Sequence, residues 1–134
     1  MLDESKDFLL DRLDDVLEPL ARKLTGKLQW DEMKENALRA TTSARGGARH
    51  VAALVRDLVE KTGISVHVVG HSAGSILLAP LVQLLTHAGE IPRGPLAGEQ
   101  GLGMTIDTCT LWAPACTVAC FDLHYRPSIE AGGG

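Results

Sequence analysis

The stretch VHVVGHSAGSILLAPLVQLL, residues 66–85, decides the fold of this chain. Its first part belongs to a short, β-branched and nearly all apolar segment, Ile64–Val69, which is typical of a strand buried on both faces of a parallel sheet. From Ala73 to about His87 the apolar residues recur at helical spacing, and Pro80 is expected to bend that helix. The sequence therefore predicts a strand, a tight turn and a helix, in that order.

The turn between the predicted strand and helix reads Gly70-His71-Ser72-Ala73-Gly74, a G-x-S-x-G sequence. On so tight a turn, the residues two before and two after the serine approach neighbouring backbone, so Gly70 and Gly74 would remove a steric clash. The turn lifts the Ser72 hydroxyl above the sheet and aims the Ala73 N–H at the position where an oxyanion would form. The positive end of the following helix adds to that field. One turn is thus predicted to supply a nucleophile and half of an oxyanion hole.

The first 62 residues are predicted to be mainly helical. An amphipathic pattern covers residues 2–24, with Pro19 as a kink or break, and a weaker helical pattern runs from about Trp30 to Ala40. A clearer third helix is indicated by an apolar stripe, with Gly63 as its C-terminal cap. The stripe consists of Val51, Leu54, Val55, Leu58 and Val59.

The remaining segments complete an α/β pattern with few strands. Ile91–Gly103 is rich in proline and glycine and is expected to be a mobile surface loop, and Thr105–Trp112 is predicted to be a second strand. A buried parallel sheet of only two strands has unpaired edges, so we expect these two strands to be part of a larger sheet. The predicted fold class is α/β: an incomplete parallel sheet of about two strands flanked by helices. It forms one partial domain over residues 1–134, with its core at residues 64–125.

Composition narrows the classes of partner. The 134 residues are 45% hydrophobic and 22% charged with a net charge of −4, which suits one globular domain and offers no basic surface for nucleic acid. No apolar run is long enough to cross a bilayer, and the N-terminus lacks a basic signal-peptide region, so we expect a cytoplasmic protein. Cys109, Cys116 and Cys120 lack zinc-type spacing and are expected to be buried reduced thiols. No metal and no cofactor is predicted.

The residues around the G-x-S-x-G sequence resemble a known family. Residues 66–85 are similar to the nucleophile-elbow region of the α/β-hydrolase superfamily, and residues 108–117, TCTLWAPACT, resemble the sixth strand of that sheet. Residues 30–58 resemble the helical stretch before the nucleophile strand in a bacterial subset of hydrolases. The resemblance implies that Ser72 is the nucleophile, that the Ala73 N–H is one oxyanion donor, and that the elbow requires Gly70 and Gly74.

The chain departs from this family in the catalytic partners of Ser72. In the family the acid and the histidine base follow on later loops, and the other oxyanion donor lies upstream. Here the upstream region is helical and the chain ends soon after the second predicted strand, so we expect a sequence truncated at both ends. His124, oriented by Asp122 or Glu130, is the candidate base, because the adjacent side chains of His71 and Ser72 point apart.

Two other families with similar five-letter sequences fit less well. Acyl-carrier-protein transacylases typically have a glutamate directly after the second glycine, where this chain has Ser75. Patatin-like lipases use a later Asp-Gly pair, which the sequence lacks. Acyl transfer through a serine remains the reaction class that the sequence favours.

Two hypotheses about function follow. The first is a serine hydrolase core that hydrolyses carboxylic esters through an acyl-enzyme on Ser72, with a small-molecule ester as the substrate of a full-length form. Without a positioned base, this chain alone is expected to hydrolyse p-nitrophenyl acetate barely above background. The alternative is a non-catalytic fragment or a protein-interaction module, able to self-associate through an exposed sheet edge.

Overall fold

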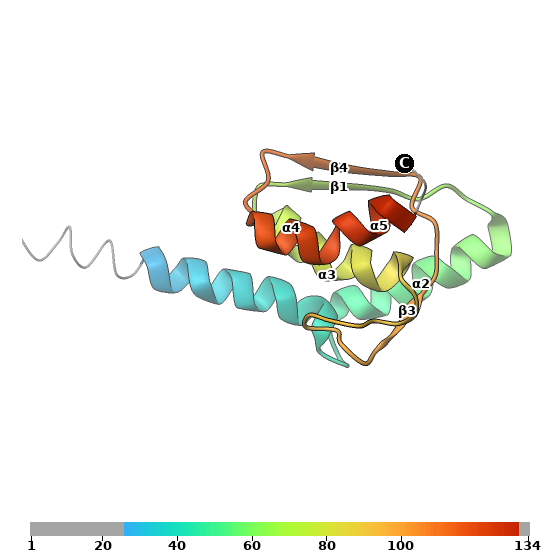
Figure 1. Cartoon of the computed structure of the whole chain (residues 1–134), viewed down its shortest axis with the longest axis horizontal. Coiled ribbons are helices and arrows are strands. Elements are labelled where there is room, and N and C mark those ends of the chain that lie inside the picture. Colours follow the sequence, from blue (N-terminus) through green and yellow to red (C-terminus); the bar gives the residue numbers. More distant parts are fainter. Residues whose placement is uncertain (1–25, 132–134) are drawn as a thin grey trace, which may run out of the picture. The chain divides into compact units, whose positions relative to one another are not determined.

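The computed structural model describes residues 26–131 and has an α/β fold with two small sheets (Figure 1). Contacts divide the chain into two compact units, residues 1–33 and 34–134, and the described part of the first unit, residues 26–33, is helical. The amphipathic helix predicted for residues 2–24 lies outside the described residues. Within residues 26–131, no helix combines the length and apolar character that a bilayer crossing needs.

The helical prediction for the region before the first strand is confirmed where the chain is described. Residues 26–42 are helical, and α2 spans Gly47–Thr62. α2 ends at Gly63, whose left-handed φ of 66° lets its N–H donate to Val59 O at 2.8 Å. Glycine is favoured at this position because a side chain would be strained there.

The apolar stripe that indicated α2 does not pack into the core as a whole. Val51, Leu54 and Leu58 are exposed, and Ala52 makes the buried contact of this helix. The spacing of apolar residues thus located the helix correctly but not the face that it buries.

Two parallel strands and the helix between them form the centre of the second unit. β1 (His67–His71) pairs in parallel with β4 (Thr108–Trp112), with His67 beside Thr108 and His71 beside Trp112. α3 (Gly74–Thr86) starts directly after the turn that follows β1 and continues through Pro80. The predicted order of strand, turn, helix and second strand is confirmed, although β1 begins and ends later than expected.

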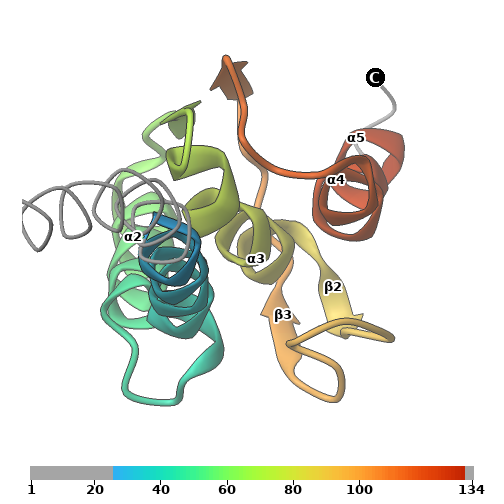
Figure 2. The ribbon, with the colours of Figure 1, turned by 90° about the vertical axis from the view of Figure 1, so that its left-hand side faces the viewer.

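The expectation that this strand is buried on both faces is wrong. Val68 packs against the core and Gly70 is buried against α3, whereas His67, Val69 and His71 are exposed on the opposite face. These three side chains are exposed because the helices lie on the other side of β1 and β4 (Figures 1 and 2).

The segment expected to be a mobile surface loop, Ile91–Gly103, is mostly exposed, but it contributes two side chains to the core. β2 (Ala88–Glu90) and β3 (Gln100–Leu102) form an antiparallel pair, and Ile91 and Leu96 between them are fully buried. Backbone hydrogen bonds close the turns of the segment. Its prolines and glycines do mark turns. The buried side chains of Ile91 and Leu96 pack these turns against α2 and α3.

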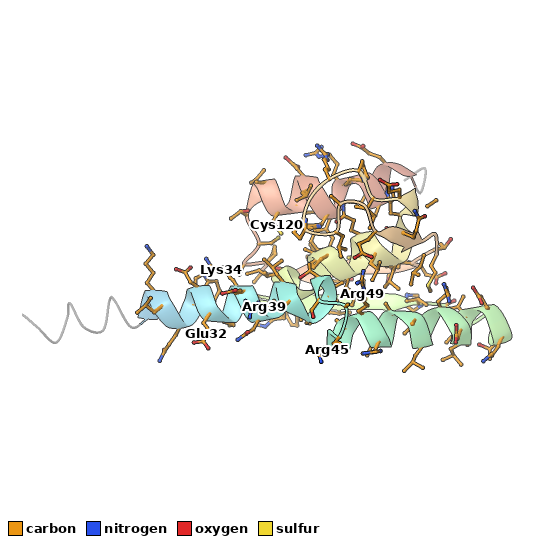
Figure 3. All side chains as sticks on the ribbon, turned by 90° about the horizontal axis from the view of Figure 1, so that it is seen from below. Glu32, Lys34, Arg39, Arg45, Arg49 and Cys120 are labelled. Carbon is orange, nitrogen blue, oxygen red and sulfur yellow. The ribbon has the colours of Figure 1, made fainter. Side chains whose placement is uncertain are left out.

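An ion pair also joins this segment to α2. Arg49 Nη2 lies 2.9 Å from Glu99 Oε2, and Arg49 is labelled near the start of α2 in Figure 3. Because both side chains are partly exposed, we expect the pair to contribute at most about 1 kcal/mol. The buried apolar side chains of the segment therefore contribute most of the free energy that holds it against the helices.

Two short helices follow β4, in a region for which the sequence analysis names no helix or strand. α4 spans Val118–His124, with Thr117 as a side-chain cap, and α5 spans Arg126–Ala131. Figure 2 shows α4 and α5 on one side of α3 and α2 on the other. α3 is therefore the central helix, and its apolar residues belong to two buried clusters, one with Ile91 and the other with Tyr125.

We expect the isolated chain to self-associate at tens of micromolar, because β1 has an open edge and an exposed outer face. Sedimentation velocity should show oligomers whose fraction rises with concentration. Val69→Lys places a charge at a 66% exposed position of β1 and should reduce association. Val118→Lys, at a 76% exposed position on α4, should leave it unchanged. A monodisperse monomer throughout this range contradicts the expectation.

Candidate active site

Ser72 lies at the turn between β1 and α3, just beyond the carboxyl ends of both parallel strands. Its N–H donates to Trp112 O at 3.0 Å, so the end of β4 fixes the peptide plane before Ser72. The φ of Ser72 is 50°, in the left-handed region that residues other than glycine rarely occupy. A strained serine at a strand-to-helix turn is the geometry expected of a G-x-S-x-G sequence.

The backbone N–H of Ala73 is free to bind a negative charge. Ala73 is the N-cap residue of α3, with φ −60° and ψ −22°, and its N–H donates to no acceptor within residues 26–131. The first turn of α3 contains no acidic side chain that would compete for this position. Because the N-terminus of a helix attracts anions, this N–H can act as one oxyanion donor.

The two glycines of the turn differ in their surroundings. A Cβ at Gly70 would lie 2.8 Å from Leu78 Cδ1 and 3.3 Å from backbone atoms of Gly74 and Ser75. A Cβ at Gly74 would meet no heavy atom within 4 Å among the described residues. The close approach of β1 to α3 therefore favours glycine at position 70, because Leu78 would have to move and the backbone contacts would be tight, whereas the clash expected at position 74 is absent.

All five histidines of the chain lie in the described part, and none forms a hydrogen bond with Ser72 Oγ. His71 is exposed, and its ring meets Trp112 edge-on, with centroids 5.8 Å apart. His67 lies within β1, and although a histidine inside a strand is expected to be a hydrogen-bonded core residue, its side chain is on the exposed outer face. Its Nδ1 lies 2.8 Å from Thr108 Oγ1.

The candidate base, His124, is not brought to Ser72. It lies at the end of α4 with 2% of its surface exposed, and its Nδ1 is 2.8 Å from Gln83 Oε1. A helical rise of about 1.5 Å per residue places Gln83 about 13 Å beyond Gly74 along α3. A general base must come within about 3 Å of the proton that it removes. His124 therefore has no direct access to Ser72.

The surroundings of His124 make it a neutral structural residue. Asp122, which was expected to orient it, pairs instead with Arg126 at 2.6 Å, and no hydrogen bond within residues 26–131 joins Glu130 to it. Burial lowers the pKa of His124, so the ring is neutral at neutral pH. Because Gln83 Oε1 can only accept, Nδ1 carries the proton.

Ser75 belongs to the site, although its position in the sequence predicts no role for it there. It is fully buried, and its Oγ donates to Ser72 O at 2.7 Å. A serine in the first turn of a helix often bonds to nearby backbone, so a local signal was present. The spacing alone does not say which backbone groups the hydroxyl contacts.

A cavity of about 510 Å³ lies among α3, β4, α4 and α5. Ser72 is not among its lining residues, and none of them is charged. One lining residue, Cys109, is exposed rather than buried as expected, whereas Cys116 and Cys120 are partly buried. Desolvation raises the pKa of the Cys109 thiol, so the thiol stays protonated. The cavity fits apolar groups and not ionic ones. Among residues 26–131, no three His, Cys, Asp or Glu side chains lie close enough together to hold a metal ion.

Comparisons with known proteins give no match, whether the chain is compared with family models, curated proteins or solved structures. The geometry around Ser72 is therefore the basis on which a function can be assigned.

Replacement of the two glycines should separate their roles. Gly70→Ala is expected to lower the free energy of unfolding by about 1–3 kcal/mol, because the new methyl group overlaps Leu78 and the backbone of α3. Gly74→Ala should change it by less than about 1 kcal/mol, since the methyl group enters open space at a helical position. Urea denaturation of both variants measures the difference, and equal effects would contradict this account.

Protonation of His124 should destabilise the fold. Since its pKa is lowered on folding, the unfolded chain binds more protons once the pH drops below about 6.5. The free energy of unfolding should therefore fall with pH below that value until the folded pKa is reached. His124→Gln should make this fall shallower in urea titrations at several pH values, whereas His50→Gln, at an exposed position, should not. Identical slopes for the parent and His124→Gln would refute the assignment.

Proposed function

We propose that residues 64–125 form the nucleophile-elbow part of an α/β-hydrolase-like sheet, and that Ser72 is the nucleophile of a serine hydrolase core acting on carboxylic esters. The observation that carries this proposal is the φ of 50° at Ser72, in a turn between a parallel strand and a helix. Backbone strain of this kind costs about 1–3 kcal/mol and concentrates at functional sites. The free N–H of Ala73 gives the proposal a second support.

The proposed reaction is acyl transfer in two steps. Ser72 Oγ attacks the ester carbonyl carbon and gives its proton to a base, while the Ala73 N–H donates to the negative oxygen of the tetrahedral intermediate. The intermediate collapses, the alcohol leaves with a proton from the base, and an acyl-Ser72 ester remains. Water then attacks that ester, which releases the carboxylic acid and restores the hydroxyl.

The described residues bring no general base to Ser72, since His124 is held at Gln83. A serine hydroxyl without a base is a weak nucleophile, so turnover of esters by this chain alone is expected barely above background. The chain nevertheless supplies one oxyanion donor, and such a donor is worth about 10²–10³-fold in rate. A diffusible base should therefore reveal the reactivity of Ser72.

A protein-interaction module is the second candidate function. The uncharged cavity beside α3 and the exposed outer face of β1 and β4 favour it, since exposed apolar surface commonly marks contact with another chain. This candidate assigns no chemistry to Ser72, so the reactivity of that hydroxyl separates the two.

Reaction with a fluorophosphonate probe, with imidazole added as the base, tests the proposed nucleophile. Peptide mass spectrometry should show Ser72 labelled at least about tenfold faster than the exposed Ser43 of the same chain. The Ala73 N–H beside Ser72 lies at the positive N-terminus of α3, whereas Ser43 follows the C-terminal end of a helix. Without imidazole, labelling at both positions should be close to background.

Two controls accompany this experiment. Ser72→Ala should abolish the fast labelling, and Ser43→Ala should leave it intact. If Ser72 reacts no faster than Ser43 with imidazole present, the proposed nucleophile is wrong and the interaction module becomes the better candidate.

A further inference from the structure

A buried hydrogen-bond network joins the turn at Ser72 to the loop that follows β4. The Ser75 hydroxyl lies at its centre, with none of its residue's surface exposed. Ser75 Oγ donates to Ser72 O at 2.7 Å and accepts from the N–H groups of Ala115, at 3.1 Å, and Cys116, at 3.0 Å. One hydroxyl therefore holds the turn, the first turn of α3 and the loop together.

This network fixes the peptide plane after Ser72. The Ser72 carbonyl accepts from Ser75 Oγ and also from the N–H groups of Ser75 and Ala115, each at 3.1 Å. The plane before Ser72 is fixed by the bond from its N–H to Trp112 O. With both planes held, the φ and ψ of Ser72 have little freedom to relax.

Tyr125 extends the same network through the backbone carbonyl of Ser75. Its hydroxyl donates to Ser75 O at 2.6 Å, its residue is 2% exposed, and its ring stacks on Phe121 with centroids 5.6 Å apart. Burial raises the pKa of Tyr125, and three neighbouring cysteines add to the shift. The phenol thus keeps its proton and remains a donor throughout the pH range in which proteins are usually studied.

We infer that Ser75 and Tyr125 are positioning residues that hold Ser72 in its left-handed conformation. Among the described residues neither hydroxyl bonds to Ser72 Oγ, and both donate instead to backbone carbonyls, Ser75 Oγ to that of Ser72 and Tyr125 to that of Ser75. They act through Ser72, so their importance for catalysis rests on the proposed function. Their effect on the backbone of Ser72 does not rest on it, and can be measured without any activity.

A purely structural role makes a different prediction. If Ser75 only stabilised the core, its removal would lower stability and leave the conformation of Ser72 unchanged. If it positions Ser72, its removal takes one of three donors from the Ser72 carbonyl, leaves the Ala115 N–H with Ser72 O as its one acceptor and deprives the Cys116 N–H of its acceptor. The turn should then relax toward negative φ. The backbone angle at Ser72 is therefore the decisive readout.

Nuclear magnetic resonance of the full labelled chain can follow that angle through the three-bond couplings of the Ser72 amide proton to Hα and Cβ. The parent should show couplings of a positive φ. Ser75→Ala should shift them to values of a negative φ, and Ser75→Thr, which keeps the hydroxyl, should restore them. Tyr125→Phe removes one hydroxyl only, should shift the couplings in the same direction, and keeps the test decisive if Ser75→Ala does not fold.

Ser128→Ala is the matched control, because it removes a part-buried hydroxyl that bonds to Thr86 and not to the turn. It should leave the Ser72 couplings unchanged. Couplings that stay at positive φ in both Ser75→Ala and Tyr125→Phe overturn the inference, as does an equal shift in Ser128→Ala.

Labelling by the fluorophosphonate probe with imidazole separates this inference from the proposed function. Ser75→Ala should slow labelling of Ser72 by at least about tenfold, since a small misplacement of a reacting group has effects of that size or larger. If the parent is not labelled at Ser72 but the couplings shift as expected, the proposed function fails and the positioning role stands. If the parent is labelled at Ser72 but the couplings do not shift in the variants, the proposed function stands and the positioning role fails.

Discussion

A single buried hydroxyl, Ser75 Oγ, is the point at which three pieces of backbone meet, namely the turn at Ser72, the start of α3 and the loop after β4. Each of its hydrogen bonds contributes about 0.5–1.5 kcal/mol, and together they are comparable with the cost of a left-handed serine. The strained turn can therefore persist only while all three pieces stay in place. The parallel pairing of β1 and β4 is part of the same constraint, because Trp112 O holds the other side of the turn.

α3 connects the turn at Ser72 with the two buried clusters of the second unit. Its first two turns lie so close to β1 that a side chain at position 70 would crowd Leu78 and the backbone, and its later turns contribute to both buried clusters. One cluster includes Ile91 and Leu96 from the connection between β2 and β3, and the other includes Tyr125. The helix thus couples the geometry of the turn to the packing of Ile91, Leu96 and Tyr125, for which no hydrogen bond with Ser72 is found among the described residues.

The strand, turn and helix at residues 66–85 could be predicted because their signals are local: β-branched residues, a glycine at a close approach, and apolar side chains at helical spacing. Which faces are buried could not, because burial depends on segments from elsewhere in the chain. Val69 looks like a core residue in sequence yet is exposed, and Leu96 in a proline- and glycine-rich segment is fully buried. The candidate base failed for the same reason, since nothing near His124 in sequence reveals that Gln83 binds its ring.

The long sequence separation between Ser72 and its partners Trp112, Ala115 and Tyr125 has a consequence for folding. Local contacts form early, whereas contacts that close a long loop form late. A nascent chain that has emerged only as far as α3 has no Trp112 carbonyl and no Ala115 N–H to hold the turn, so nothing opposes relaxation of Ser72 to an ordinary backbone angle. The strained serine is therefore set late during synthesis from the N-terminus, and its appearance marks the moment when β4 and the loop after it have docked against the turn.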